Sequence, residues 1–280
     1  MRNNRFIAIL IAVILVLLSV SGCDQGTKYA PYTALRVATE GNAAWPEPNI
    51  IGFEYSGPSE VSVTVNGVTY TGTYADSGIS MPFYYDIDHE FRGDGFEFHI
   101  REGNGKLVDL RVEVTEPSGE ALDASRLRQI ADSIADDYIP LKNSKVEIKE
   151  LDYTSEVQFR YYRTVQEYVT GEWVLVRLNS SGELTLLMLS APDAFENVKR
   201  IHIDENKAEK ALDEKLNEMY KEIGLSGGES TYRIDDKEII MTVNNQCALL
   251  YEIVLNGSHI SERFYMLVIV DHEKYNPFKP

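Results

Sequence analysis

"DASRLRQIADSIADDYIP", residues 123–140, decides the fold class because its apolar side chains recur at helical spacing between two blocks of β-type sequence. Steps of three and four residues are typical of a helix that buries one face. The apolar positions are Leu127, Ile130, Ala131, Ile134, Ala135 and Tyr138. Asp123 is a suitable N-cap, and Pro140 is expected to end the helix. One amphipathic helix among strands predicts an α+β protein.

The same plan occurs twice along the chain. After the first helix come the segments "KVEIKEL", "EVQFRYYRTV", "EWVLVRL" and "ELTLLML". Asp204 then opens a second helical pattern, with Gly224 placed to cap its end, and "TYRI", "KEIIMTV", "ALLYEIVL" and "RFYMLVIV" follow. We therefore predict tandem units of one helix packed on an antiparallel β-sheet, over residues 119–200 and 201–280.

A β-rich segment, residues 49–118, is expected before the first unit. In "VSVTVNGVTYTGTY", residues 61–74, an Asn-Gly pair between alternating strands is a strong hairpin signal, and it pairs Val65 with Val68. A second hairpin runs from "FEFHI" through "REGNGK" to "LVDLRVEV". There His99 lies on the face opposite Phe96 and Phe98, so we expect it to meet solvent.

The N-terminus has the three parts of a secretory signal. Arg2 and Arg5 precede an unbroken apolar run over residues 6–18, and small residues then lead to Cys23. The run is shorter than the ~20 residues that a spanning helix needs. Residues 23–48 contain scattered proline and glycine, which predicts a flexible tether with one short strand near residues 34–39.

The residues Val20-Ser21-Gly22-Cys23 resemble the lipobox of bacterial lipoprotein precursors. The resemblance implies that residues 1–22 are a signal peptide, that the chain is cut before Cys23, and that Cys23 carries acyl chains such as palmitate. It further implies a lipid anchor in the cell membrane, with the chain on the extracytoplasmic face and the bilayer as a partner through Cys23. Several acyl chains on one residue make stable anchoring reasonable.

A second resemblance covers roughly residues 121–270. The helix, the aromatic-rich strand and the "NSSGE" hairpin turn resemble the PepSY and YcdB/YcdC-type repeats of bacterial exported proteins. The resemblance implies a non-catalytic module that binds or regulates partners, and it brings no catalytic residues. The second copy departs from the pattern, because Asp271-His272-Glu273-Lys274 stands where the glycine turn should be, so its sheet is expected to be one strand short.

The acidic charge of the chain bears on its partners. The formal net charge is −17. Loss of residues 1–22 would remove two arginines and no acidic residue, which gives −19. Such a chain repels phosphate backbones, so we expect no nucleic-acid partner. Hydrophobic residues make up 44% of the chain, which favours a folded protein over a disordered acidic one.

Cys247, the second of two cysteines, is expected to be a small buried hydrophobe.

The sequence offers little support for catalysis or metal binding. "DIDHE", residues 86–90, is interpreted as a solvated turn, with a divalent-cation site as the alternative. "RGD", residues 92–94, is expected to be a turn in which Gly93 and Gly95 adopt positive φ. The histidines lack zinc-site spacing, and no G-x-S-x-G elbow is present. We predict no metal, no cofactor and no nucleophile–base pair in a polar cleft, and hence no enzyme.

The binding face is predicted on "FRYYRTVQEYV", residues 159–169. Arg160 and Tyr162 share the face opposite Phe159 and Tyr161, and tyrosine and arginine are enriched at interaction hot spots. An exposed edge of the same strand could also accept a peptide strand. The sequence therefore predicts a membrane-anchored binding or regulatory module for peptides or envelope proteins. The alternatives are an extracytoplasmic hydrolase with a site assembled from distant residues, and a structural envelope or spore protein.

Overall fold

The computed structural model describes residues 34–37, 54–79, 87–114, 119–151, 155–222, 231–242, 245–256 and 261–274. Residues 1–30 are divided from a compact unit formed by residues 31–280. The signal segment, Cys23, Asp86 and Gly224 lie outside the described residues. Among the residues described, no helix is both long and apolar enough to cross a membrane.

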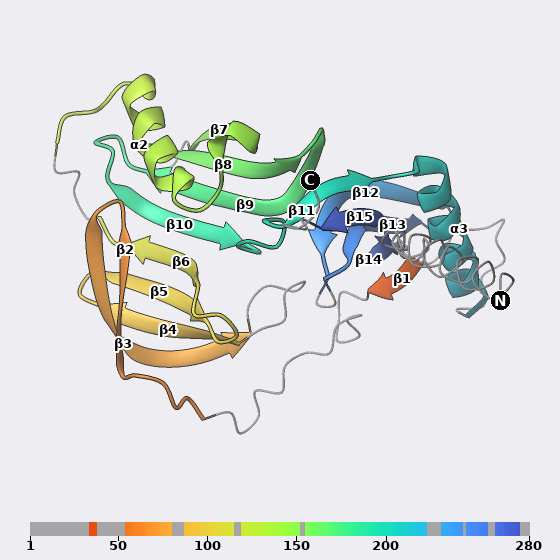
Figure 1. The fold of residues 1–280 in the computed structure, drawn as a ribbon, viewed down its shortest axis with the longest axis horizontal. Helices are drawn as coiled ribbons and strands as arrows, with labels where there is room; N and C mark the ends of the chain where they lie inside the picture. The colour runs from red at the N-terminus through yellow and green to blue at the C-terminus, as the bar shows by residue number, and fades with distance from the viewer. Residues whose placement is uncertain are drawn as a thin grey trace, which may run out of the picture. The chain divides into compact units, whose positions relative to one another are not determined.

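The described fold belongs to the α+β class and is mostly β-sheet, with two α-helices (Figure 1). The first helix is α2 (Ala124–Asp136), and the Asp123 carboxylate accepts a 2.8 Å hydrogen bond from the Arg126 amide. The second is α3 (Glu205–Glu222), where Asp204 accepts from the Lys207 amide at 3.2 Å. The predicted N-cap Asp123 is confirmed, and the second helix begins directly after Asp204, as predicted.

Strands β2 to β6 follow one another along the chain, and each pairs antiparallel with the next. They are β2 (Glu60–Val65), β3 (Val68–Ile79), β4 (Ile87–Gly93), β5 (Phe96–Arg101) and β6 (Leu107–Val112). The Asn66-Gly67 turn is confirmed, with φ of 49° and 78° and with Val65 opposite Val68. The turn predicted around residues 86–90 is wrong, since Ile87–Gly93 is a strand. Of the two glycines expected to have positive φ near the RGD stretch, only Gly95 does, because Gly93 continues β4.

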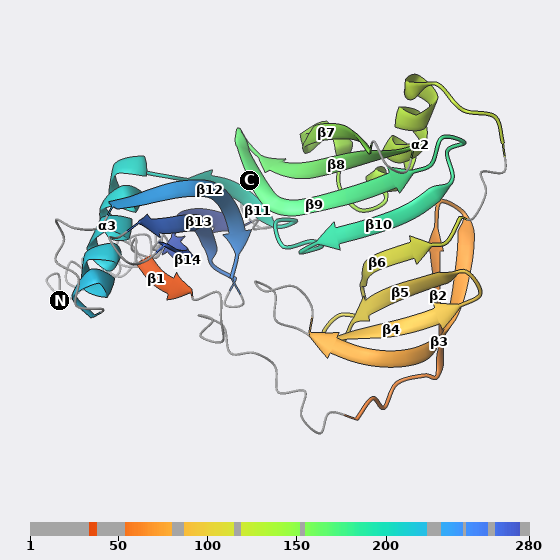
Figure 2. The same ribbon diagram turned by 180° about the vertical axis from the view of Figure 1, so that it is seen from behind.

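The middle strands extend this sheet. A 3₁₀ turn, η1 (Leu141–Asn143), leads into β7 (Ser144–Leu151), β8 (Glu156–Val165), β9 (Tyr168–Leu178) and β10 (Leu184–Ser190). Strand β10 lies beside β6, so the β-rich segment and the middle strands form one sheet (Figure 2). Helix α2 buries Leu127, Ala131 and Ile134 in a core that includes Phe98 and Phe159.

Five strands follow along the chain. They are β11 (Val198–His202), β12 (Thr231–Met241), β13 (Cys247–Asn256), β14 (Ser261–Ile269) and β15 (Asp271–Lys274). Strands β12, β13 and β14 among them form the other end of the sheet. "TYRI" and "KEIIMTV" join into the single strand β12, with an irregularity between Ile234 and Asp236. A second core lies here, and it includes Cys247, which is fully buried as expected. Burial raises the pKa of the Cys247 thiol to about 12.

The outer edge of β14 is covered by a strand from the N-terminal part of the chain. Strand β15 turns away and pairs with β11 in a separate two-stranded sheet. The edge of β14 is instead paired with β1 (Ala34–Val37), antiparallel, with Ala34 opposite Val268. The short strand expected near residues 34–39 is thus part of the C-terminal sheet.

Candidate functional site

The predicted binding residues Arg160 and Tyr162 line a groove of about 520 Å³. Alternation along β8 buries Phe159 and Tyr161 against α2 and leaves Arg160 and Tyr162 half-buried on the opposite face. The groove lies where β7, β8 and β9 meet β12, and its lining residues are Lys145, Glu147, Arg160, Tyr162, Val169, Thr170, Gly171, Trp173, Ser190, Asp236, Lys237, Glu238 and Ile240.

An aromatic–arginine stack forms one wall of the groove. Tyr162 is directly opposite Trp173 in the sheet register. The Arg160 guanidinium lies 4.8 Å from the Trp173 ring centroid and 6.0 Å from that of Tyr162. Guanidinium groups bind aromatic faces through the ring quadrupole, and the contact holds the side chain in place. Arg160 also donates a 3.3 Å hydrogen bond to the Tyr162 hydroxyl.

A carboxylate at the same wall is already engaged. Glu147 is 3.0 Å from the Lys145 ammonium and accepts a 3.2 Å hydrogen bond from the Tyr162 hydroxyl. The Lys145 contact is the main reason that the pKa of Glu147 is lowered. The tyrosine hydroxyl is therefore held between Arg160 and Glu147, and its ring orientation is set by two partners.

The groove exists because β12 approaches β9 closely. Ile239 pairs with Thr170 in a parallel contact. A Cβ atom on Gly171 would lie 2.8 Å from a Glu238 carboxylate oxygen and 3.1 Å from the Ile239 carbonyl oxygen. A side chain at this position would require the Glu238 carboxylate to move and the Ile239 carbonyl to shift slightly, so Gly171 favours the close junction that brings Glu238 to the groove.

A buried ion pair lies next to this junction. The Arg163 Nε is 2.9 Å from Glu172, whose side chain also accepts the backbone N–H groups of Asp193 at 3.2 Å and Phe195 at 2.8 Å. Glu172 is 2% exposed. Burial raises the pKa of its carboxyl group, and Arg163 acts against this shift. The pair ties the loop after β10 to β9.

One part of the prediction for β8 is wrong. Strand β8 is hydrogen-bonded to β7 on one side and to β9 on the other. It therefore offers no edge for a peptide strand, and a ligand would reach Arg160 and Tyr162 through side chains. In the described part of the chain, β7 pairs only with β8.

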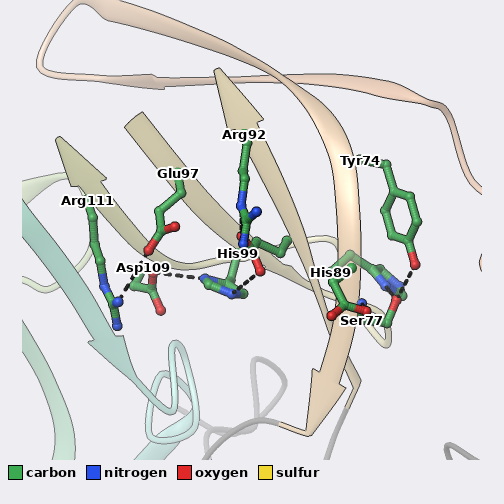
Figure 3. A network of polar contacts seen from close by, with 10 residues as sticks. Tyr74, Ser77, His89, Arg92, Glu97, His99, Asp109 and Arg111 are labelled. Carbon is green, nitrogen blue, oxygen red and sulfur yellow. Dashed lines mark hydrogen bonds and ion pairs between the residues drawn. The ribbon is translucent and has the colours of Figure 1, made fainter. Parts of the chain in front are cut away.

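A second polar region lies on β3–β6, and Figure 3 shows its contacts. His99 is not solvent-facing as predicted. Its Nδ1 is 3.0 Å from Asp109, its Nε2 is 3.9 Å from Glu90, and it lines a cavity of about 290 Å³. The hydrogen bond to Asp109 is the main reason that the pKa of His99 is raised.

On the other face of β4, a serine and a histidine meet. The Ser77 hydroxyl lies 2.9 Å from His89 Nδ1 and 2.9 Å from the Tyr74 hydroxyl, and His89 Nε2 contacts Glu102 (Figure 3). The prediction excluded a nucleophile–base pair at hydrogen-bond distance in a polar cleft, and its part about distance is wrong, since Ser77 and His89 form such a pair. His89 is 4% exposed, and the Tyr55 ring lies 4.6 Å from it. No group of metal-ligating side chains was found among the described residues.

Sequence reasoning missed Trp173 and Glu238. A two-residue turn pairs Val165 with Tyr168, and uninterrupted counting from there would place Gly171 opposite Tyr162. An irregularity shifts the register, so Trp173 takes that position. The buried ion pair of Arg163 could have been expected from the sequence, because Arg163 is a charged residue on the strand face that also carries Phe159 and Tyr161. Nothing in the sequence could have placed Glu238 at the groove, because it lies on β12, far along the chain from β8.

Comparison with known proteins gives one distant likeness. No protein-family model matches the chain, and no curated protein matches it. A solved structure, the Bacillus megaterium YpeB C-terminal domain, is 11% identical over 72% of this chain and 88% of that chain, with a TM-score of 0.34. The comparisons show a distant structural likeness to that domain and assign the chain to no family.

Proposed function

We propose that this protein is an extracytoplasmic lipoprotein, anchored through Cys23, whose ectodomain is a non-catalytic binding or regulatory module. Its sheet would consist of tandem PepSY-like units after a β-rich segment. The observation that supports binding is the stack of Arg160 on Trp173 at 4.8 Å along a 520 Å³ groove. Grooves of ~300–1,000 Å³ with a few convergent polar groups are typical of ligand sites. The partner is proposed to be a peptide or an envelope protein.

Cross-linking on intact cells tests this function. The tagged full chain is expressed in its native host beside Arg160→Gln/Tyr162→Ala, Cys23→Ala and Arg177→Gln variants. We expect one discrete partner with the wild-type and Arg177→Gln proteins, and its loss in the double variant. Equal capture by the double variant would refute the groove as the binding face. A Cys23→Ala protein that still fractionates with membranes would refute the lipid anchor.

Hydrolysis is the second candidate function, and it is favoured by the contacts of His89 with Ser77 on one side and Glu102 on the other. A hydroxyl beside an imidazole that is held by a carboxylate is the arrangement that activates serine nucleophiles. Incubation with a fluorophosphonate probe, comparing wild-type protein with Ser77→Ala, tests it. Labelling that requires Ser77 would establish a reactive serine. Absence of labelling would mean that the Ser77, His89 and Glu102 side chains serve only to hold the strands together.

A further inference from the structure

The charges of the groove are only partly neutralised. Lys145 pairs with Glu147, and Lys237 lies 3.1 Å from Glu205 on α3. Within the described part of the chain, neither Arg160 nor Glu238 forms an ion pair. The groove thus presents an arginine and a glutamate without a direct ion-pair partner among the residues described, and the Arg160 charge acts on Glu238 only as a minor influence that lowers its pKa.

Arg160 is arranged to receive a carboxylate. Its guanidinium carbon lies 4.8 Å from the Trp173 ring centroid, and this contact holds the charged group at the wall of the groove. Its Nε is buried and has no hydrogen-bond partner among the described residues. A buried donor without a partner is unfavourable, and an arginine fork matches a carboxylate with two parallel hydrogen bonds. A carboxylate in the groove would therefore give the Arg160 guanidinium the ion-pair partner that it lacks among the described residues.

Glu238 is arranged to receive a cation. Burial and the neighbouring Asp236 together raise the pKa of its carboxyl group. Gly171 brings the backbone of β9 against this side chain, so the carboxylate is held at the junction. An ammonium group placed there would offset both the burial and the repulsion from Asp236.

We infer that the groove binds a short peptide with free ends, its carboxylate at Arg160 and its ammonium group at Glu238. This inference rests on the proposed function and names its ligand class. Apolar atoms of Trp173, Val169 and Ile240 line the same groove and would contact the peptide side chains. A polyanion fits poorly, because Glu147, Asp236 and Glu238 all line the groove in a chain of net charge −17.

Calorimetric titration with four forms of one dipeptide tests the inference. The probes are alanyl-leucine, its N-acetyl form, its C-terminal amide and the doubly blocked form, each added to the detergent-solubilised full chain. Charged hydrogen bonds are about twice as strong as neutral ones, so each block is expected to weaken binding at least tenfold. In Arg160→Gln, amidation should no longer matter. In Glu238→Gln, acetylation should no longer matter.

The controls separate this inference from the proposed function. Arg177→Gln changes an arginine of the same strand as Trp173 that does not line the groove, so it should bind like wild type. Circular dichroism of each variant checks folding, and Arg160→Lys keeps the charge if Arg160→Gln is unstable. Equal affinity for all four forms, or no binding of any, overturns the zwitterion inference. Loss of the cross-linked partner in the Arg160→Gln/Tyr162→Ala protein would still uphold the binding module.

Discussion

Loss of the Glu172 carboxylate should destabilise the fold, because this group pairs with Arg163 and accepts two backbone N–H groups. Glu172→Gln would leave the Arg163 guanidinium buried without its counter-charge, and breaking a buried pair costs about 3–5 kcal/mol. We expect the free energy of unfolding in urea to fall by about 3 kcal/mol. An Arg163→Met/Glu172→Gln protein should lose less than the single variant. A single variant within about 0.5 kcal/mol of wild type would show that the pair does not hold the loop after β10.

His99 should make stability depend on pH. Its pKa is raised in the folded protein, mainly by the hydrogen bond to Asp109. The protonated ring therefore stabilises the fold fully below the unfolded pKa of about 6.5, and this contribution is lost as the pH rises through the folded pKa. The charged groups that line the same cavity are Asp76, Asp88, Glu90, Asp109 and Arg111.

Urea unfolding of wild-type and His99→Gln proteins across pH 5 to 9 measures this effect. The difference in stability between the two proteins should be largest at the acid end and shrink towards alkaline pH. A difference that grows as the pH rises would contradict the assignment.

At the scale of elements, the junction of β9 with β12 depends on Gly171. In Gly171→Ala, the new methyl group would meet Glu238 and the Ile239 carbonyl oxygen. Overpacking of this kind costs about 1–3 kcal/mol. Thermal unfolding should show a loss of stability in that range. The double variant Gly171→Ala/Glu238→Ala should recover part of it, because the clash with the Glu238 side chain is removed while the one with the Ile239 carbonyl oxygen remains. An unchanged melting temperature would mean that β12 can move away from β9 freely.

At the scale of the whole molecule, β1 closes the C-terminal sheet with residues more than 200 positions before β14. Leu35→Pro would remove a backbone donor and fix φ, both of which oppose pairing. Hydrogen exchange should then quicken for the amides of residues 265–268. Leu35→Ala, which keeps the backbone donor, is the matched control. Unchanged exchange in Leu35→Pro would show that β1 does not protect this edge.

Much of the fold could be predicted because its signals are local. The helix at residues 124–136 follows from apolar spacing and an N-cap within one segment, and the Asn66-Gly67 hairpin follows from adjacent residues. Alternation also placed Arg160 and Tyr162 on one face, since successive side chains of a strand point to opposite sides. The predicted turn at residues 86–90 failed because polar letters do not reveal burial: Asp88 and His89 are 6% and 4% exposed within β4.

The sequence by itself determined the α+β class, the two helices, most strands and the face that carries Arg160. Tertiary structure alone decided that Trp173 stands opposite Tyr162, that Glu238 reaches the same groove, and that β1 completes a sheet at the far end of the chain. The physical reason is the separation along the chain of the residues that interact. Helix caps and hairpin turns are formed by residues close together in the sequence. The junction of β9 with β12 and the groove depend on the packing of distant segments, and the sequence of one segment does not indicate where the other will lie.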